Sequence, residues 1–150
     1  MNKKSDFDLE QFLPYRLSIL TNTISQGIAA SYRDKFDITV TEWRILAVLG
    51  RYPGLTASEV VERTAMDKVA IHRAVKTLMS KNLLERRIDS ADRRRRKLCL
   101  SKGKGQKVLK EIIPRARNYE KKLFETLNPA ETQAFLATLE KLLHVAISKR

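Results

Sequence analysis

Cysteine is nearly absent from this sequence of 150 residues, and so are long apolar runs. Cys99 is the only cysteine, so the chain cannot form an internal disulfide and is not a disulfide-stapled secreted domain. No stretch approaches the roughly 20 apolar residues that a membrane-spanning helix needs. The first residues also lack the apolar run of a signal peptide, because the chain turns acidic at Asp6 and Asp8. We therefore expect a soluble protein that is located in the cytoplasm and has no membrane partner.

The sequence also lacks the signatures of enzymes and metal sites. There is no nucleophile elbow, and Gly103 and Gly105 are too isolated to form a phosphate-binding loop. The two histidines, His72 and His144, lie far apart in the chain, and no cluster of His, Cys and carboxylates has metal-ligand spacing. The sequence therefore predicts no enzyme activity, no metal site and no cofactor.

Acidic residues are scarce relative to basic ones. The chain has 30 Lys and Arg against 17 Asp and Glu, a formal net charge of +13. Residues 67–110 hold 15 basic and four acidic side chains, a net charge of +11, which leaves +2 for the other 106 residues. A local excess of this kind favours a polyanionic partner such as nucleic acid. The alternatives are an anionic membrane surface and a basic face that contacts only water.

Helix signals begin near the N-terminus. Pro14 suits the first position of a helix, and an apolar stripe predicts that this helix runs to about Asp34. Capping-box spacings at Thr39–Glu42 and Thr56–Glu59 predict the starts of two further helices. The apolar stripe of the first helix consists of Leu13, Leu17, Leu20, Ile24 and Ile28.

The middle of the chain predicts two helices joined by a short turn and followed by a hairpin. The helix that begins at Thr56 has about eight residues. Asp67 can cap a helix of about fourteen residues, and Asn82 tolerates the left-handed backbone that ends it. Residues 83–88 and 97–100 alternate apolar and polar side chains as strands do, and the run between them is polar and rich in arginine. This is the pattern of a helix-turn-helix followed by a β-hairpin with a basic tip.

The C-terminal third predicts two more helices. Ser101 can cap the first of them, and Pro114 inside it should kink or split it. The segment from Asn128 to Glu131 is a strong start for the second, whose apolar side chains recur at helical spacing over residues 135–147. With 43% hydrophobic residues, a chain of this length is able to bury a core of its own.

The hairpin sequence resembles that of a known family. Leu83-Leu84-Glu85-Arg86-Arg87 and Asp89-Ser90-Ala91-Asp92-Arg93-Arg94 are similar to the strand and wing signatures of the MarR family, the multiple antibiotic resistance regulators. Residues 67–78 likewise resemble the recognition helix of that family. The resemblance extends over nearly the whole chain, from about Leu13 to Ile147.

The resemblance implies a mainly α fold with a small β-hairpin wing, which is a winged helix-turn-helix with N- and C-terminal dimerisation helices. Residues 39–101 would form the DNA-binding domain, and residues 1–38 and 102–150 the dimerisation region. The implied function is a sequence-specific, ligand-responsive repressor that binds a pseudo-palindromic operator as a homodimer.

Two other functions remain open. A sequence-nonspecific architectural protein would also bind double-stranded DNA, but with little preference among sequences. A basic membrane-surface protein would need an amphipathic helix with a cationic face, whereas the arginines of this chain lie in a turn.

Two groups of side chains are predicted to contact DNA. One is the outward face of the helix capped by Asp67, where basic side chains can pair with guanine, His72 can donate or accept, and Ala70 can touch a thymine methyl group. The other is the arginine run, which suits a narrow minor groove and the phosphates beside it. By resemblance, Asp92 pairs with a neighbouring basic group and holds the wing. The predicted DNA-binding residues are Lys68, Ala70, His72, Arg73, Lys76, Arg93, Arg94, Arg95 and Arg96.

An effector site is predicted on the first helix, where Arg16 lies beside the apolar stripe. The resemblance implies that small aromatic acids bind between the dimerisation helices and the DNA-binding domain. Arg16 would hold the carboxylate, and Tyr15 or Trp43 would lie near the ring. The alternative role of Arg16 is a salt bridge at the surface or between subunits. Cys99 is predicted to be an inert, partly buried thiol, the alternative being a redox sensor.

Overall fold

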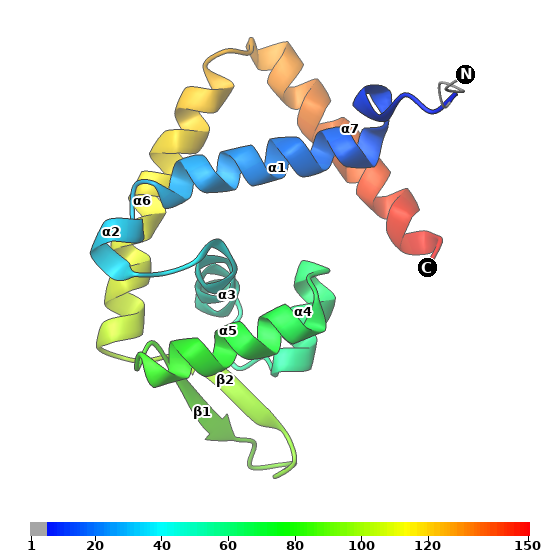
Figure 1. Cartoon of the computed structure of the whole chain (residues 1–150). Helices are drawn as coiled ribbons and strands as arrows, with labels where there is room; N and C mark the ends of the chain where they lie inside the picture. The colour runs from blue at the N-terminus through cyan, green and yellow to red at the C-terminus, as the bar shows by residue number, and fades with distance from the viewer. Residues whose placement is uncertain (1–5) are drawn as a thin grey trace, which may run out of the picture. The chain divides into compact units, whose positions relative to one another are not determined.

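A computed structural model describes residues 6–150 (Figure 1). Residues 1–5, part of the expected polar arm, lie outside the described residues. The chain forms two compact units, one up to Arg115 and one from Ala116 to Arg150. The elements are η1 (Leu9–Gln11), α1 (Leu13–Ala29), α2 (Arg33–Phe36), α3 (Val40–Arg51), α4 (Ala57–Thr64), α5 (Lys68–Ser80), β1 (Leu84–Ile88), β2 (Arg96–Leu100), α6 (Lys104–Phe124) and α7 (Pro129–Ser148).

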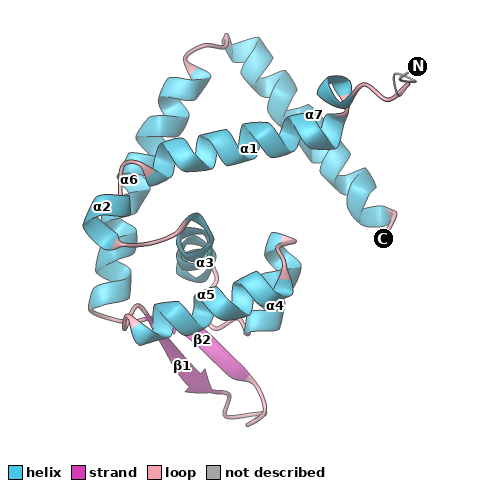
Figure 2. Cartoon of the chain, in the orientation of Figure 1, coloured by secondary structure: helices cyan, strands magenta, loops and turns pink. Residues whose placement is uncertain are grey.

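The predicted mainly helical fold with a small hairpin is confirmed (Figure 2). β1 and β2 pair as an antiparallel two-stranded sheet, and the rest of the regular structure in residues 6–150 is helical. None of these helices combines the length and the apolar character of a membrane span.

Short-range polar contacts set the predicted helix ends. Thr39, Thr56 and Asn128 each form a complete capping box with the glutamate three residues later. Asp67 caps α5 by accepting a backbone hydrogen bond of 2.8 Å. Asn82 has the left-handed backbone predicted for it, with φ of 57°. These boundaries were predictable because each depends on neighbouring residues alone.

The predicted end of the first helix was wrong. α1 ends at Ala29 rather than near Asp34, and a separate short helix, α2, follows it. Ala29 and Tyr32 are fully buried. The backbone N–H groups of Ser31 and Tyr32 donate to carbonyls only three residues earlier, which tightens the chain at this point. Packing against the core therefore ends the helix although the apolar spacing continues.

α6 runs from Lys104 to Phe124 without splitting at Pro114, so of the predicted kink or split, the split does not occur. Proline removes the hydrogen bond to the carbonyl four residues earlier, which belongs to Lys110. Both residues are exposed, so water can satisfy that carbonyl. The predicted cap is confirmed, because Ser101 Oγ accepts a hydrogen bond of 2.7 Å from the Gly105 N–H.

The core of the first unit fixes which face of α5 points outward. One face of α5 packs against α3, α4 and the hairpin, and the first half of α6 adds further apolar side chains. The strands join this core through Leu98, whose N–H donates to the Leu55 carbonyl at 2.8 Å. The α5 residues in the core are Ile71, Ala74, Val75 and Leu78.

The C-terminal end of α5 is anchored by Lys81. Its ammonium donates to the Asp37 carbonyl at 2.5 Å and to Glu42 Oε2 at 3.1 Å. Glu42 is only 5% exposed, and the same oxygen accepts the backbone N–H of Thr39. A buried carboxylate needs such partners, because leaving it unpaired costs several kcal/mol. The end of α5 is therefore tied to the start of α3.

Candidate nucleic-acid interface

The outward face of α5 carries a row of exposed side chains. Positions 69, 72, 73 and 76 recur at helical spacing and are all exposed, opposite the buried face of the helix. His72, Arg73 and Lys76 therefore point away from the core, and Lys68 is also exposed. Ala70 is only half-buried and lies at the edge of this face. An α-helix that presents such a row fits the major groove of DNA.

A pocket of about 390 Å³ lies between α5, the start of α4 and the hairpin. It brings together His72, which comes from α5, and the wing residues Arg94, Arg95 and Arg96. Arg86 of β1 and the first residues of α4 complete its lining. The positive end of the α4 dipole and these guanidinium groups all favour an anion such as a phosphate. Of the predicted DNA-binding residues, Lys68, Ala70, Arg73, Lys76 and Arg93 do not line it.

Asp89 forms the ion pairs that hold the wing. Its carboxylate lies 3.1 Å from Lys97 Nζ and 4.0 Å from Arg95 Nε. It also accepts the backbone N–H of Ala91 at 2.9 Å. This backbone hydrogen bond, followed by that from Lys97, lowers the pKa of Asp89. The carboxylate therefore stays ionised at neutral pH and closes the base of the wing turn.

Asp92, predicted to hold the wing through a basic partner, acts differently. Its Oδ1 accepts the backbone N–H of Arg94 at 3.0 Å, and its carbonyl accepts that of Arg95. Within residues 6–150 it has no cation within ion-pair distance. Asp92 thus shapes the tip of the wing through the backbone, whereas Asp89 supplies the charge pairing.

In addition to the ion pairs of Asp89, an ion pair between Arg95 and Glu59 tethers the wing to α4. Arg95 Nη2 donates to Glu59 Oε1 at 2.7 Å, while Glu59 Oε2 accepts the N–H of Thr56 in the capping box. The hydrogen bond from Thr56, and then the charge of Arg95, lower the pKa of Glu59. This tether is therefore present at neutral pH and is lost as the pH falls through the lowered pKa.

The ion pairs of Asp89 and Glu59 leave three wing arginines available to bind an anion. Arg93, Arg94 and Arg96 are exposed, and no carboxylate of residues 6–150 lies within 4.0 Å of their guanidinium groups. Arg95 differs from them because Glu59 and Asp89 already engage it. The four consecutive arginines thus divide into one that positions the wing and three that are free to bind an anion.

The two contacts of Glu59 can be separated by mutation. Glu59→Gln keeps the capping-box acceptor but removes the ion pair, so we expect stability within about 1 kcal/mol of the parent and faster amide exchange in residues 89–97. Glu59→Ala also removes the cap and should cost a further ~1 kcal/mol. Thermal unfolding and hydrogen exchange measure the two effects. Unchanged exchange in both variants would show that the tether does not order the wing.

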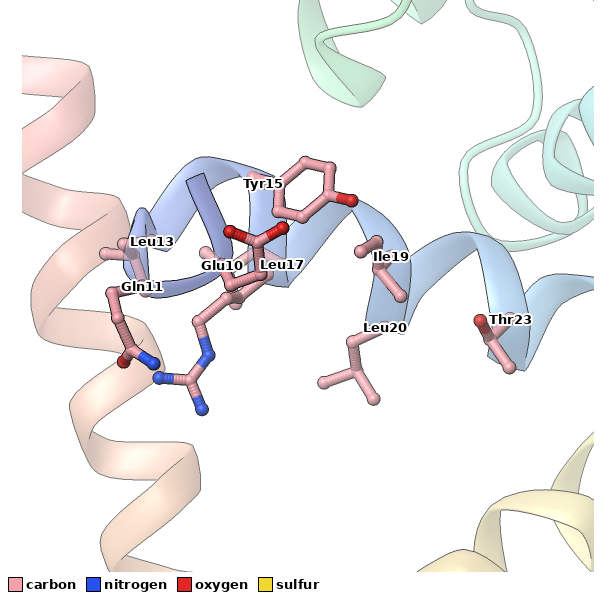
Figure 3. Close-up of a pocket in the computed structure, with 9 residues that line it drawn as sticks. Glu10, Gln11, Leu13, Tyr15, Leu17, Ile19, Leu20 and Thr23 are labelled. Carbon is pink, nitrogen blue, oxygen red and sulfur yellow. The ribbon is translucent and has the colours of Figure 1, made fainter. Parts of the chain in front are cut away.

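The predicted effector residues divide between two places. An open groove of about 740 Å³ runs along η1 and the first half of α1. Tyr15 and Arg16 line it, together with leucine and isoleucine side chains (Figure 3). Trp43 does not line it but lies against Tyr32, with ring centroids 6.1 Å apart. The structure therefore brings together Arg16 and Tyr15 and places Trp43 elsewhere.

The groove has an acidic neighbour that the sequence did not indicate. Glu10, in η1, is among its lining residues. Arg16 is exposed in the single chain, and no carboxylate of residues 6–150 lies within 4.0 Å of its guanidinium. The alternative of a surface ion pair within the chain is thus not realised in the described residues, and the guanidinium is available to a ligand or to another subunit.

Cys99 is partly buried between the buried Leu98 and Leu100 of β2. In residues 6–150, no group of three or more His, Cys, Asp and Glu side chains could hold a metal ion.

The sequence analysis missed Glu59, Asp89 and Arg86 as parts of this interface. Glu59 had a visible local role as a capping residue, but its partner Arg95 is 36 residues away, and no short-range pattern indicates that pair. Asp89 was noted only as part of the polar run and of the wing signature, and neither pattern indicates its pairing with Lys97 and Arg95. The alternation of the strand could have indicated Arg86, because every second residue of a strand shares a face.

Comparison with known proteins agrees with this geometry. The sequence pattern of the MarR family matches residues 36–95, which include α3, α4, α5, β1 and most of the wing turn. The transcriptional regulator HosA of Escherichia coli O127:H6 is 23% identical over 108 residues, which are 72% of this chain and 79% of HosA.

Solved structures extend the similarity beyond that segment. The MarR/EmrR family transcriptional regulator from Acinetobacter sp. ADP1 is 27% identical, with a TM-score of 0.84 over 95% of this chain and 99% of that chain. Bordetella bronchiseptica BpsR, whose DNA binding is regulated by 6-hydroxynicotinic acid, is 23% identical, with a TM-score of 0.78 over 92% of this chain and 97% of BpsR.

The family pattern covers the helix-turn-helix, and the similarity of fold covers the dimerisation helices expected on either side of it. MarR proteins are regulators rather than enzymes. In the sequence of residues 36–95 and in its fold, this chain is therefore similar to the winged-helix transcriptional regulators of the MarR family.

Proposed function

We propose that the protein is a sequence-specific repressor that binds double-stranded DNA as a homodimer. The observation that carries this proposal is the exposed row on α5 next to a wing in which three arginines pair with no carboxylate of residues 6–150. Inserted into the major groove, the row can read base edges, while the wing reaches the minor groove or the phosphates. The predicted residues Lys68, Ala70 and Lys76 would support the same contact.

Selection of bound sequences from a random DNA pool tests the proposal. We expect a pseudo-palindromic site that the protein prefers over random DNA by roughly 10³-fold or more, with affinity that falls steeply as salt increases. A sequence-nonspecific architectural protein would show the salt dependence without the preference. Reporter expression with the selected site near a promoter then distinguishes repression from activation.

Two helices carry apolar side chains that a lone chain leaves exposed. No residue of α7 is buried, and four large apolar residues of α1 are exposed as well. Apolar faces of this kind mark interfaces, which supports residues 1–38 and 102–150 as the dimerisation region and 39–101 as the DNA-binding domain. The exposed residues are Leu13, Leu17, Ile19 and Leu20 of α1, and Phe135, Leu136, Leu139, Leu142, Leu143, Val145 and Ile147 of α7.

Light scattering in moderate salt should therefore give twice the chain mass of 17.3 kDa. Leu139→Glu places a charge on the apolar face of α7 and should shift the mass toward that of one chain. A parent protein that is monomeric at micromolar concentration would contradict the dimer. It would also contradict the spacing of about 34 Å between recognition helices that two half-sites require.

A small aromatic carboxylate is the proposed effector. Arg16 supplies a cation beside apolar side chains, and Tyr15 supplies an aromatic ring in the same groove. The regulation of BpsR by 6-hydroxynicotinic acid supports an effector of this chemistry. The effector would release DNA by binding more tightly to a dimer arrangement that misplaces the α5 helices. A regulator of this kind acts where the DNA is, which is the cytoplasm.

Arg16→Ala tests the carboxylate contact. It should leave DNA affinity within a few-fold of the parent and weaken the effector by about 1.5–3 kcal/mol, the range for hydrogen bonds to charged groups. Tyr15→Ala should also weaken it, whereas Trp43→Phe should not, because Trp43 lies outside the groove. The measurement is a titration of the DNA complex with aromatic acids and their uncharged amides. Equal release by acids and amides would contradict the role of Arg16.

A further inference from the structure

Two of the large apolar side chains are more exposed than any other in residues 6–150. They are Val69, at 63%, and Ile88, at 72%. Neither belongs to the apolar faces of α1 and α7 that the proposed dimer would cover. Val69 is on α5, and Ile88 is at the end of β1, next to the wing turn. Both therefore lie on the elements proposed to contact DNA.

Val69 belongs to the exposed row of α5 itself. It lies three residues before His72, four before Arg73 and seven before Lys76, which is the spacing of one helix face. A β-branched residue has a lower helix propensity than a straight-chain polar one, so neither solvation nor helix stability favours valine here. Ala70, the residue predicted from the sequence to make an apolar contact, is half-buried at the edge of this face. The apolar group that faces outward is that of Val69.

The chemistry of the major groove limits what Val69 can contact. Base edges there offer hydrogen-bond donors and acceptors, and their apolar group is the C5-methyl of thymine. We propose that Val69 packs against a thymine methyl group and determines specificity at one position of each half-site, close to the base read by Arg73. This proposal rests on the proposed function, because it requires that α5 enters the major groove.

Replacing thymine by deoxyuridine tests the contact, because it removes the C5-methyl and leaves every hydrogen-bonding group in place. Each thymine of the selected site is replaced in turn, in both half-sites at once. At one position we expect affinity to fall roughly fourfold per half-site, the effect of one methyl group that is no longer buried, or about 15-fold for the dimer.

The same DNA series is then measured with Val69→Ala. We expect this variant to bind the parent site about as weakly as the parent protein binds the deoxyuridine site, and to lose its sensitivity to deoxyuridine at that position alone. Ile88→Ala is the matched control, because it removes an even more exposed apolar side chain, at the end of β1 beside the wing turn. It should keep the deoxyuridine effect in full. Circular dichroism checks that both variants are folded.

The outcomes separate this proposal from the proposed function. If the protein selects a defined site but no thymine methyl matters, or if Val69→Ala remains sensitive at the same position, the assignment of Val69 is overturned and sequence-specific binding stands. If no sequence is preferred over random DNA, both the proposed sequence-specific binding and the role of Val69 are contradicted.

Discussion

Arg73→Ala is expected to cost the dimer about 1–3 kcal/mol of DNA-binding free energy at each half-site, which is about 2–6 kcal/mol for the operator. Arg73 is on the exposed row of α5, and no carboxylate of residues 6–150 lies within 4.0 Å of its guanidinium. Its two-pronged hydrogen bonding fits the N7 and O6 atoms of guanine. Titration of the selected site and of variants at each base pair would show preference lost at one position per half-site.

Two controls separate base reading from charge. Arg73→Lys keeps the positive charge but cannot donate two parallel hydrogen bonds to one guanine, so most of the preference for that base should still disappear. Arg94→Ala should weaken binding more evenly and reduce any preference for A·T pairs beside the major-groove contact. If Arg73→Ala and Arg94→Ala both bound the selected site and random DNA as the parent does, the interface would lie elsewhere.

Gly105→Ala is expected to destabilise the protein by about 3 kcal/mol, although glycine to alanine inside a helix ordinarily stabilises by up to ~1 kcal/mol. A Cβ at Gly105 would overlap the Leu83 carbonyl oxygen and lie 3.0 Å from Ser101 Oγ. The Leu83 carbonyl also accepts the N–H of Ser101. The methyl group would therefore push apart the junction where the hairpin meets α6.

Thermal unfolding at fixed protein concentration measures this effect, which corresponds to roughly 6–12 °C in Tm for a chain of this size. Gly103→Ala is the matched control, because a Cβ at Gly103 meets nothing within 4 Å, and its stability should change by less than about 0.5 kcal/mol. Equal melting temperatures for the two variants would contradict the close approach at Gly105.

Local signals predicted the element order of this fold. The capping boxes at Thr39, Thr56 and Asn128 involve residues three apart, so they can be recognised in the sequence without knowledge of tertiary contacts. The end of α1 was not predictable in this way, because it depends on Tyr32 and its burial in the core. The continuity of α6 at Pro114 likewise depends on which side of that helix faces water.

In the candidate site too, some features follow from local sequence and others depend on tertiary contacts. Helical periodicity identified the outward direction of Arg73, because the buried residues of α5 occupy the opposite face. The same periodicity places Val69 on the outward face and Ala70 at its edge, but the sequence prediction counted only the basic residues, His72 and Ala70 as contacts and passed over the valine. The pairing of Arg95 with Glu59 required the tertiary arrangement of the wing and α4, so a run of four arginines looked uniform in the sequence.

The anchoring of α5 at both ends determines where the entropy cost of DNA binding falls. Asp67 caps the start of α5, and Lys81 joins its end to Glu42, so the backbone of the helix is already ordered before DNA arrives. Arg93, Arg94 and Arg96 form no ion pair with residues 6–150, so on binding DNA they would lose rotamer freedom, at about 0.5–1.5 kcal/mol for each immobilised side chain. In the proposed complex, base reading would begin from a preorganised helix, and the conformational entropy of association would be lost mainly in the wing.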